Sequence, residues 1–261
     1  MPRSTLSGRT VERFAQLSLV LCGHSRPMVT HAQHNRVVIA HPGEFNRLAG
    51  WIETHGIAQQ IIQCALQQCW PALQVKPGDH ILEIGCGWGA LAEMSTTEFQ
   101  AHITGVTLST EQLAFAQERL QRLGMGAQAD LRLQDYRDIP DAPFDAVCSI
   151  EMVEAVGREF WPTYFATVAG KLKAGGRACI QSIVIDDGLF ERYINSTDFI
   201  QQYIFPGGCL PCPREFRAQA RAAGLEVVNE LSFGHDYAET LKRWRDAFLS
   251  KRTDVLSKGF D

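Results

Sequence analysis

The chain has 261 residues, 45% of them hydrophobic and 21% charged, a composition typical of a globular protein with a well-buried core. Its formal net charge of -4 argues against a general nucleic-acid binder, which would carry a basic surface. No apolar run reaches the roughly 20 residues of a membrane-spanning helix, and no clear signal cleavage site is present, so we expect a cytoplasmic protein.

Residues 1–74 differ in character from the rest of the chain. Arginine and histidine are frequent there, and the one convincing helical periodicity, that of an amphipathic helix, falls within residues 45–70. No motif in this region points to a function. We therefore expect residues 1–74 to form an N-terminal helical cap and residues 75–261 to form the main domain.

From residue 75 onward, segments typical of strands alternate with segments typical of helices. The expected strands are residues 80–85, 103–108, 131–134, 144–150, 177–184 and 225–231, and the expected helices are residues 90–97, 110–123, 161–172 and 238–249. Strands separated by helices form parallel βαβ units, which predicts an α/β, doubly wound, Rossmann-like sheet. Ligands of such sheets bind at the carboxyl ends of the strands.

Residues 75–89, with the sequence VKPGDHILEIGCGWG, are the most informative stretch of the chain. They predict a loop, a short buried strand that contains Glu83, and a turn with glycines at positions 85, 87 and 89. Glycines there allow a sharp turn and let the backbone approach a ligand closely. The helix that begins near Ala90 would direct its positive end toward that ligand. Taken alone, this pattern is a weak indication of a nucleotide-type cofactor.

The end of the second expected strand narrows the choice of cofactor. The residues from Ser109 to Gln112, STEQ, have the form of a capping box, in which Ser109 caps the following helix and Gln112 reaches back. Thr107 occupies the position at which a nicotinamide enzyme usually presents an acid to the ribose. The residues therefore disfavour a redox enzyme that shares the glycine turn.

The eight cysteines are scattered along the chain, which suits reduced thiols in apolar surroundings. Cys209 and Cys212 form a CxxC pair, but no second pair and no suitable histidine cluster follows. We therefore expect no metal site.

Six motifs follow one another along the chain: EIGCGWG, GVTLSTEQLAFAQERL, LQDYRD, SIEMVEAVG, YIFPGGCLP and DYAETLKRW. Their succession resembles the cyclopropane-fatty-acyl-phospholipid synthase family over roughly residues 75–261. The resemblance implies a class I methyltransferase that transfers a methyl(ene) group from S-adenosylmethionine to the cis double bond of an unsaturated phospholipid acyl chain. The resulting carbocation would close to a cyclopropane. Phospholipid at the membrane surface would be the partner, which leaves open peripheral attachment to the inner face of the membrane and a homo-oligomer.

The resemblance also implies which residues contact the cofactor, at the ends of the first three strands. These residues are Glu83, Gly85, Cys86, Gly87, Trp88, Gly89, Thr107, Leu108, Ser109, Gln112, Tyr136 and Arg137. The residues themselves leave other roles open. Tyr136 could be a half-buried aromatic that closes the third loop, and Gln112 could be only the capping partner.

For the proton-removal step, the resemblance implies a bicarbonate ion as base. Glu154 and Tyr237 would hold it, with Ile183 at a backbone contact position and Gln181 where many family members have histidine. Glutamine can donate a hydrogen bond to an anion but cannot carry a positive charge. From the residues alone, Glu154 could instead satisfy free amides at a helix N-terminus, and Tyr237 could be a packing aromatic. We expect Glu151 to support the loop rather than perform chemistry.

Two features depart from the family pattern. The motifs that normally precede the glycine turn and supply a cysteine are absent, and Cys22, Cys64 and Cys69 lie in no matching context. The family inserts a final strand antiparallel between the fifth and sixth strands, and the last strand is apparently missing here. Unpaired buried backbone groups cost about 1–3 kcal/mol each, so we expect a compromised domain unless another chain or a rearrangement covers the gap.

These departures keep two other functions open. The first is a methyltransferase for a free small molecule, which would use the same cofactor cleft. The second is a truncated, inactive relative that binds the cofactor without catalysis.

Overall fold

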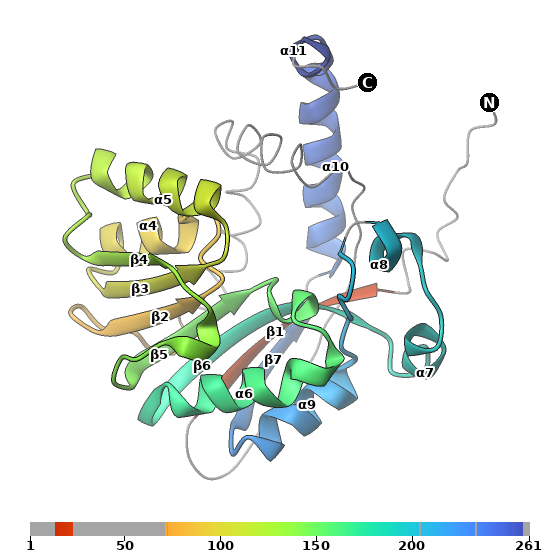
Figure 1. Cartoon of the computed structure of the whole chain (residues 1–261), viewed down its shortest axis with the longest axis horizontal. Helices are drawn as coiled ribbons and strands as arrows, with labels where there is room; N and C mark the ends of the chain where they lie inside the picture. Colours follow the sequence, from red (N-terminus) through yellow and green to blue (C-terminus); the bar gives the residue numbers. More distant parts are fainter. Residues whose placement is uncertain (1–13, 23–70, 72, 204, 233, 258–261) are drawn as a thin grey trace.

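The computed structural model describes residues 14–22, 71, 73–203, 205–232 and 234–257 (Figure 1). They form an open seven-stranded sheet in the order β4-β3-β2-β5-β6-β1-β7. Its strands are β1 (Phe14–Cys22), β2 (His80–Ile84), β3 (His102–Thr107), β4 (Ala129–Leu133), β5 (Phe144–Ile150), β6 (Leu172–Ile185) and β7 (Glu226–Ser232). The pairs β2–β3, β3–β4, β2–β5 and β5–β6 are parallel. The predicted α/β, doubly wound, Rossmann-like fold is therefore confirmed.

The helices predicted at residues 90–97, 110–123, 161–172 and 238–249 are present, with ends shifted by at most four residues, and the structure adds further helices that the sequence did not predict. The α-helices are α4 (Ala90–Thr97), α5 (Thr110–Arg122), α6 (Trp161–Gly170), α7 (Phe190–Ile194), α8 (Phe199–Tyr203), α9 (Pro213–Ala222), α10 (Gly234–Ser250) and α11 (Arg252–Leu256). The short 3-10 helices are η1 (Tyr136–Asp138), η2 (Val153–Ala155) and η3 (Arg158–Phe160). In the described part of the chain, no helix combines the length and the apolar character needed to cross a membrane.

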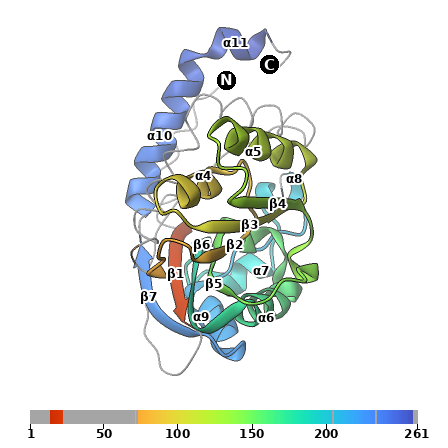
Figure 2. The same cartoon turned by 90° about the vertical axis from the view of Figure 1, so that its left-hand side faces the viewer.

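Helices cover both faces of the sheet (Figure 2). The buried side chains form two clusters, one on each face. Along β5, Val147 belongs to the cluster that packs under α6 and α9, whereas its neighbours Ala146 and Cys148 belong to the cluster under α4 and α5. Successive side chains of a strand point to opposite faces, so a central strand covered on both sides must be apolar almost throughout. This explains why β2 and β5 are mostly apolar, with His80 and Glu83 in β2 and Asp145 and Ser149 in β5 as the polar exceptions.

The predicted gap in the sheet is filled by β1. This strand lies antiparallel between β6 and β7, and its pairing with β6 runs from Phe14 opposite Ile185 to Cys22 opposite Arg177. The expectation that β6 and β7 lack a neighbour is therefore wrong, because a segment far away in sequence supplies their backbone partners. Residues 14–22 are also a strand rather than part of a helical cap, while the helix expected within residues 45–70 lies outside the described residues.

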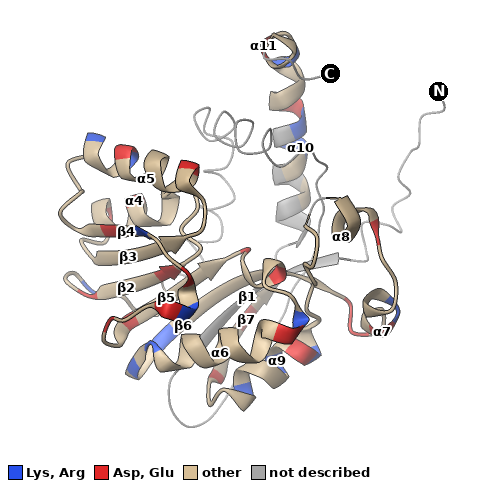
Figure 3. Cartoon of the chain, viewed as in Figure 1, with Lys and Arg blue, Asp and Glu red and all other residues tan. Residues whose placement is uncertain are grey.

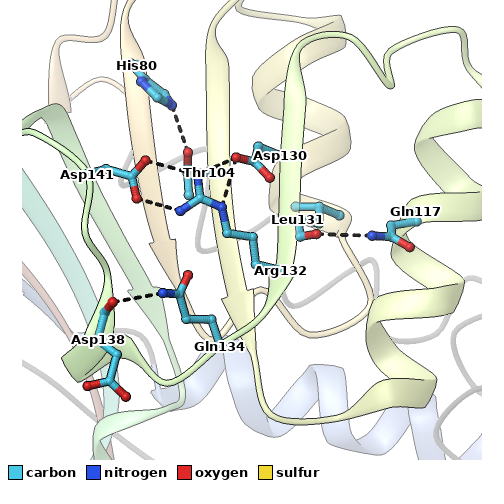
Figure 4. A network of polar contacts seen from close by, with 9 residues as sticks. All are labelled: His80, Thr104, Gln117, Asp130, Leu131, Arg132, Gln134, Asp138 and Asp141. Atoms are coloured by element: carbon cyan, nitrogen blue, oxygen red, sulfur yellow. Dashed lines mark hydrogen bonds and ion pairs between the residues drawn. The ribbon is translucent and has the colours of Figure 1, made fainter.

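The outer edge of the sheet is held by a polar network on β4 (Figure 4). Arg132 forms ion pairs with Asp130 and with Asp141, whose Oδ2 lies 2.5 Å from its Nη1. On the next strands, His80 Nε2 lies 2.9 Å from Thr104 Oγ1. The network fastens the edge strand to the loop before β5, and we assign it a structural role.

Candidate active site

The glycine turn joins β2 to α4 as predicted. Gly85, Gly87 and Gly89 all have positive φ, at 87°, 49° and 79°. A Cβ at Gly89 would lie only 2.7 Å from the Cβ of Ala116, so this glycine permits the turn to pack tightly against α5. A Cβ at Gly87 would meet no atom within 4 Å. The turn therefore presents open backbone at Gly87, where a ligand can approach closely.

Glu83 stands immediately before this turn and is almost fully buried, at 4% exposure. Its Oε2 atom has no hydrogen-bond partner among the described residues. Burial raises the pKa of Glu83 well above its ordinary value, since an isolated carboxylate is poorly tolerated away from water. A bound ligand with an ammonium group would supply the partner that Glu83 lacks.

The remaining residues of the turn are anchored by packing. Cys86 is buried, and burial raises the pKa of its thiol, so it is an inert core thiol. Trp88 contacts Phe115 of α5 edge to face, with ring centroids 5.4 Å apart. The turn is thus fixed to α5 on one side and open at Gly87 on the other.

The end of β3 carries the second predicted group. Ser109 accepts a hydrogen bond from the Gln112 backbone at 3.2 Å and caps α5, as the capping box predicts. The Gln112 side chain does not reach back as expected, because its Oε1 accepts a 3.0 Å hydrogen bond from Thr107 Oγ1. Leu108, between them, is 74% exposed, which is unusual for leucine and leaves an apolar surface beside the turn.

The third group, at the end of β4, is more buried than predicted. Tyr136 is 8% exposed and packs edge to face against Tyr164, with centroids 5.8 Å apart. Arg137 is held by Asp135 through Nε–Oδ1 and Nη2–Oδ2 contacts of 2.9 and 2.6 Å. Tyr136 thus has the packing role that the residues alone left open, and its contact with a cofactor stays a prediction.

A second polar cluster lies where β5 and β6 end, next to the glycine turn. The loop after β5 touches that turn, since a Cβ at Gly85 would lie 2.9 Å from Met152 Cγ. In this loop Glu154 Oε1 accepts a hydrogen bond from the backbone N–H of Ile183 on β6. Glu154 Oε2 is buried and has no hydrogen-bond partner among the described residues.

Gln181 and Glu151 form the other half of this cluster. Gln181 is fully buried, and its Nε2 donates a 2.9 Å hydrogen bond to Glu151 Oε1. The Glu151 backbone N–H in turn donates to the Gln181 carbonyl at 3.0 Å. Glu151 adopts a φ of 51°, which is uncommon for a residue other than glycine. Residues with such backbone conformations cluster at functional sites. The prediction that Glu151 supports its loop is consistent with both hydrogen bonds.

The electrostatics of the cluster keep Glu154 mostly protonated at neutral pH. Burial and then the negative charge of Glu151 raise the pKa of Glu154 to about 8, against the opposing effect of the Ile183 N–H. Perturbed carboxyls of this kind are typical of catalytic groups.

The motif YIFPGGCLP, to which the sequence assigned no role, holds the Glu154 loop in place. The Cys209 backbone N–H donates a 2.8 Å hydrogen bond to the Glu154 carbonyl. A Cβ at Gly208 would lie 3.1 Å from the same carbonyl oxygen. Tyr237 lies in α10, but its side chain is outside the described residues, so its contact with the cluster stays a prediction.

Comparison with known proteins identifies the family. The family model for mycolic acid cyclopropane synthetase matches residues 57–260. The tuberculostearic acid methyltransferase UfaA1 of Mycobacterium tuberculosis is 40% identical over 188 residues, which cover 72% of this chain and 44% of that protein. The cyclopropane-fatty-acyl-phospholipid synthase of Escherichia coli is 39% identical over 193 residues, which cover 74% of this chain and 48% of the synthase. The chain thus spans less than half the length of these two relatives.

A solved structure agrees with this result. The mycolic acid cyclopropane synthase CmaA1 complexed with SAH and CTAB matches with a TM-score of 0.65 and 26% sequence identity. The match covers 76% of this chain and 71% of that chain. On the strength of the family model and the two relatives, the chain belongs to the mycolic acid cyclopropane synthetase family of S-adenosylmethionine-dependent methyltransferases.

Proposed function

We propose that this chain binds S-adenosylmethionine and methylates the cis double bond of an unsaturated phospholipid acyl chain, with closure to a cyclopropane. The observation that carries the proposal is the cluster of Glu151, Glu154 and the fully buried Gln181, which lies beside the glycine turn through the contact of Met152 with Gly85. Ring closure needs acid–base groups beside the cofactor, because a proton must leave the transferred methyl group.

The residues of the turn fit S-adenosylmethionine. Glu83 Oε2 lacks a partner and suits the ammonium group of the methionine portion. Gly87 leaves open backbone, and α4 directs its N-terminus toward this space. The exposed Leu108 offers an apolar surface to the nucleoside side. When bound, the cofactor supplies an electrophilic methyl group on a sulfonium centre.

The acyl chain then supplies the electrons. The π pair of the double bond attacks the methyl carbon, the carbon–sulfur bond breaks with its pair on sulfur, and the other alkene carbon becomes a carbocation. Loss of a proton from the transferred methyl group leaves the electron pair of that C–H bond to close a three-membered ring. The site must therefore exclude water, stabilise a cation and accept a proton.

The chain's own residues meet these needs. Val153, the neighbour of Glu154 in η2, is 1% exposed and belongs to the apolar core, which keeps water from this side of the loop. The negative charge of Glu151, which acts on Glu154, and that of Glu154 once it is ionised would stabilise the cation. Exposed aromatic side chains on and after α8, Phe199, Tyr203 and Phe205, offer an apolar surface to a lipid.

The resemblance also implies a bicarbonate ion as the base. Among the described residues, the Ile183 N–H donates to Glu154 and Gln181 Nε2 donates to Glu151. The Tyr164 hydroxyl, which lies close enough to interact with Glu154, is a buried donor without a hydrogen-bond partner there, and a protonated Glu154 is a donor as well. These groups would hold the ion, which would supply a proton acceptor when bound.

The test is incubation of the purified chain with methyl-labelled S-adenosylmethionine and vesicles of a cis-unsaturated phosphatidylethanolamine. Label in the acyl chain, with cyclopropane proton signals in the NMR spectrum of the product, supports the proposal. Label that appears only in water-soluble acceptors of an added cell extract favours the small-molecule methyltransferase. Cofactor binding without any transfer favours the inactive relative.

A further inference from the structure

The last two helices carry a cluster of basic side chains in a chain whose net charge is -4. Between residues 241 and 257, which comprise the outer part of α10 together with α11, there are five basic and two acidic residues. The five basic side chains are all exposed: Lys242, Arg243, Arg245, Lys251 and Arg252. We propose that residues 241–257 bind the surface of a bilayer that contains anionic phospholipid. The inference rests on the proposed function in taking a bilayer as the place where the substrate lies.

The topology of the sheet places this segment at the edge where the candidate active site lies. Strand β7 is antiparallel to β1, which is antiparallel to β6, so β7 runs in the same direction as β6 and β5. Helix α10 begins two residues after β7 ends, at the edge that also carries the glycine turn and the Glu154 loop. Figures 1 and 2 show α10 rising away from the sheet, with α11 at its outer end. A helix of 17 residues is about 25 Å long, so its outer part can contact a surface that this edge faces.

Exposed leucines lie among the basic side chains. Leu249 is 48% exposed and Leu256 is 47% exposed. Lys242 and Arg245 precede Leu249 by seven and four positions, so the three side chains lie on one face of α10. Basic residues near a helix C-terminus also complement the helix dipole, but that effect gives no reason for leucines to be exposed beside them. Cationic and apolar side chains together allow one surface to contact both the headgroups and the acyl boundary of a bilayer.

The acidic residues of this segment leave it positively charged. Asp246 Oδ2 lies 3.3 Å from Lys242 Nζ, and Asp246 Oδ1 lies 3.2 Å from Arg245 Nη1. Lys251 Nζ lies 3.7 Å from Asp254 Oδ2. Ion pairs between exposed side chains contribute little free energy, so these basic groups can turn to lipid phosphates instead. A cluster of about four to eight Lys and Arg residues on a helix is typical of binding to anionic lipid.

Docking of this segment would bring the active-site edge of the sheet to the bilayer. The double bond of an acyl chain lies below the headgroups, so the protein must bind the bilayer surface before it can reach that bond. In this arrangement anionic lipid serves as the binding partner, whereas the acyl chain that receives the methyl group can belong to any phospholipid of the same bilayer.

The first measurement is sedimentation of the purified chain with vesicles in the absence of S-adenosylmethionine. Vesicles of phosphatidylcholine alone are compared with vesicles of equal parts phosphatidylcholine and phosphatidylglycerol. We expect at least tenfold tighter binding to the anionic vesicles, and weaker binding when the salt concentration is raised to about 0.5 M. Equal affinity for both kinds of vesicle, or binding to neither, overturns the inference.

A variant with four substitutions tests whether residues 241–257 carry this binding. Lys242→Gln, Arg245→Gln, Lys251→Gln and Arg252→Gln remove exposed charges and keep good helix formers. We expect affinity for the anionic vesicles to fall at least tenfold, with S-adenosylhomocysteine affinity within twofold of wild type. The matched control removes four exposed charges that precede β2, β4 and β7 or begin β6, at the opposite edge of the sheet: Lys76→Gln, Arg122→Gln, Arg221→Gln and Lys173→Gln. An equal loss of binding in the control, or loss of a dimer of the chain without loss of vesicle binding in the test variant, contradicts the inference.

Transfer assays separate this inference from the proposed function. With unsaturated phosphatidylethanolamine in anionic vesicles, the test variant should transfer methyl groups at least tenfold more slowly than the wild type. With the same lipid in micelles of a neutral detergent, the two rates should agree within twofold, because no anionic surface is present. Unchanged vesicle binding and transfer in the variant overturn the docking surface while the proposed function stands. Vesicle binding that depends on residues 241–257, without transfer in either system, overturns the proposed function while the docking surface stands.

Discussion

The two halves of the sheet are built in different ways. On the side of β2, β3 and β4, each strand is followed directly by the turn and helix that make its part of the site, and Ser109 caps α5 within three residues of its partner. On the side of β6 and β7, the strand between them comes from residues 14–22. Charged residues of both signs are interspersed along α5, α9 and α10 (Figure 3). The comparison teaches that one half is specified by local sequence, whereas the other depends on a distant segment.

The largest expected effect breaks the distant half. Leu19 pairs with Ile180 of β6 and with Glu230 of β7, so its backbone N–H lies in the interior of the sheet. Leu19→Pro removes that donor and should cost about 3 kcal/mol or more, a large part of the roughly 5–15 kcal/mol that stabilises a typical domain. Urea unfolding followed by circular dichroism measures the effect.

Leu19→Val, which keeps the N–H and is well tolerated in strands, is the control. An unchanged midpoint for Leu19→Pro would mean that residues 14–22 do not complete the sheet in solution.

The second prediction compares the buried carboxyl of each half. Burial raises the pKa of Glu83 above its ordinary value, and burial together with Glu151 raises the pKa of Glu154 from 4.5 to about 8. The folded state therefore binds protons that the unfolded state has already released, so the free energy of unfolding falls as pH rises from about 4.5 to about 8. For Glu154 alone the loss is on the order of 4 kcal/mol.

Urea titrations at several pH values test this slope. Glu154→Gln should flatten the dependence up to about pH 8 and stabilise the protein at higher pH, and Glu83→Gln should flatten it further. Stability that rises over this interval in the wild type, or an unchanged slope in Glu154→Gln, would show that Glu154 is not buried as described.

The contrast between the halves also explains what could be predicted from the sequence. The strands on either side of the glycine turn were predicted within a residue or two, because apolar runs and turn glycines are local signals. The segment FAQLSLVLC of β1 is a short apolar run whose place in the sheet depends on partners far along the chain. Local periodicity does not encode that register.

The residues of the candidate site also fall into a group set by local sequence and a group brought together by distant elements. The positions of Glu83 and the glycines follow from one stretch of sequence, and the structure keeps them together. The pairing of Gln181 with Glu151 joins residues 30 apart that meet only because β5 and β6 are neighbours. From the sequence, Gln181 was assigned to the anion site and Glu151 to the support of its loop. The hydrogen bond from the Gln181 amide to the Glu151 carboxylate was not predicted. The hydrogen-bonding capacity left for a ligand became visible only once both partners were known.

The third prediction tests how tightly the local half is packed. Ala at position 89 would place its Cβ 2.7 Å from the Cβ and 3.1 Å from the Cα of Ala116, at a φ of 79°. Left-handed backbone and overpacking together should cost about 3 kcal/mol for Gly89→Ala. At Gly87 the backbone is also left-handed but the space is open, so Gly87→Ala should cost only about 1 kcal/mol. Thermal unfolding of the two variants measures the difference. An equal loss of unfolding free energy in both would mean that α5 shifts to accommodate the extra methyl group at position 89.

The last prediction concerns ligand binding rather than folding, and it has the smallest expected free-energy change that the binding measurement must resolve. Gly87 faces space that no described atom occupies within 4 Å, and we infer that S-adenosylmethionine fills it. Gly87→Val would place a branched side chain there, so cofactor affinity should fall at least tenfold, about 1.4 kcal/mol, by calorimetry. The same substitution leaves Glu154, Gln181 and Glu151 untouched, which separates cofactor binding from the proton-transfer cluster. If Gly87→Val binds S-adenosylmethionine as tightly as the wild type, the cofactor does not lie on this turn, and the local half of the sheet serves the fold rather than the ligand.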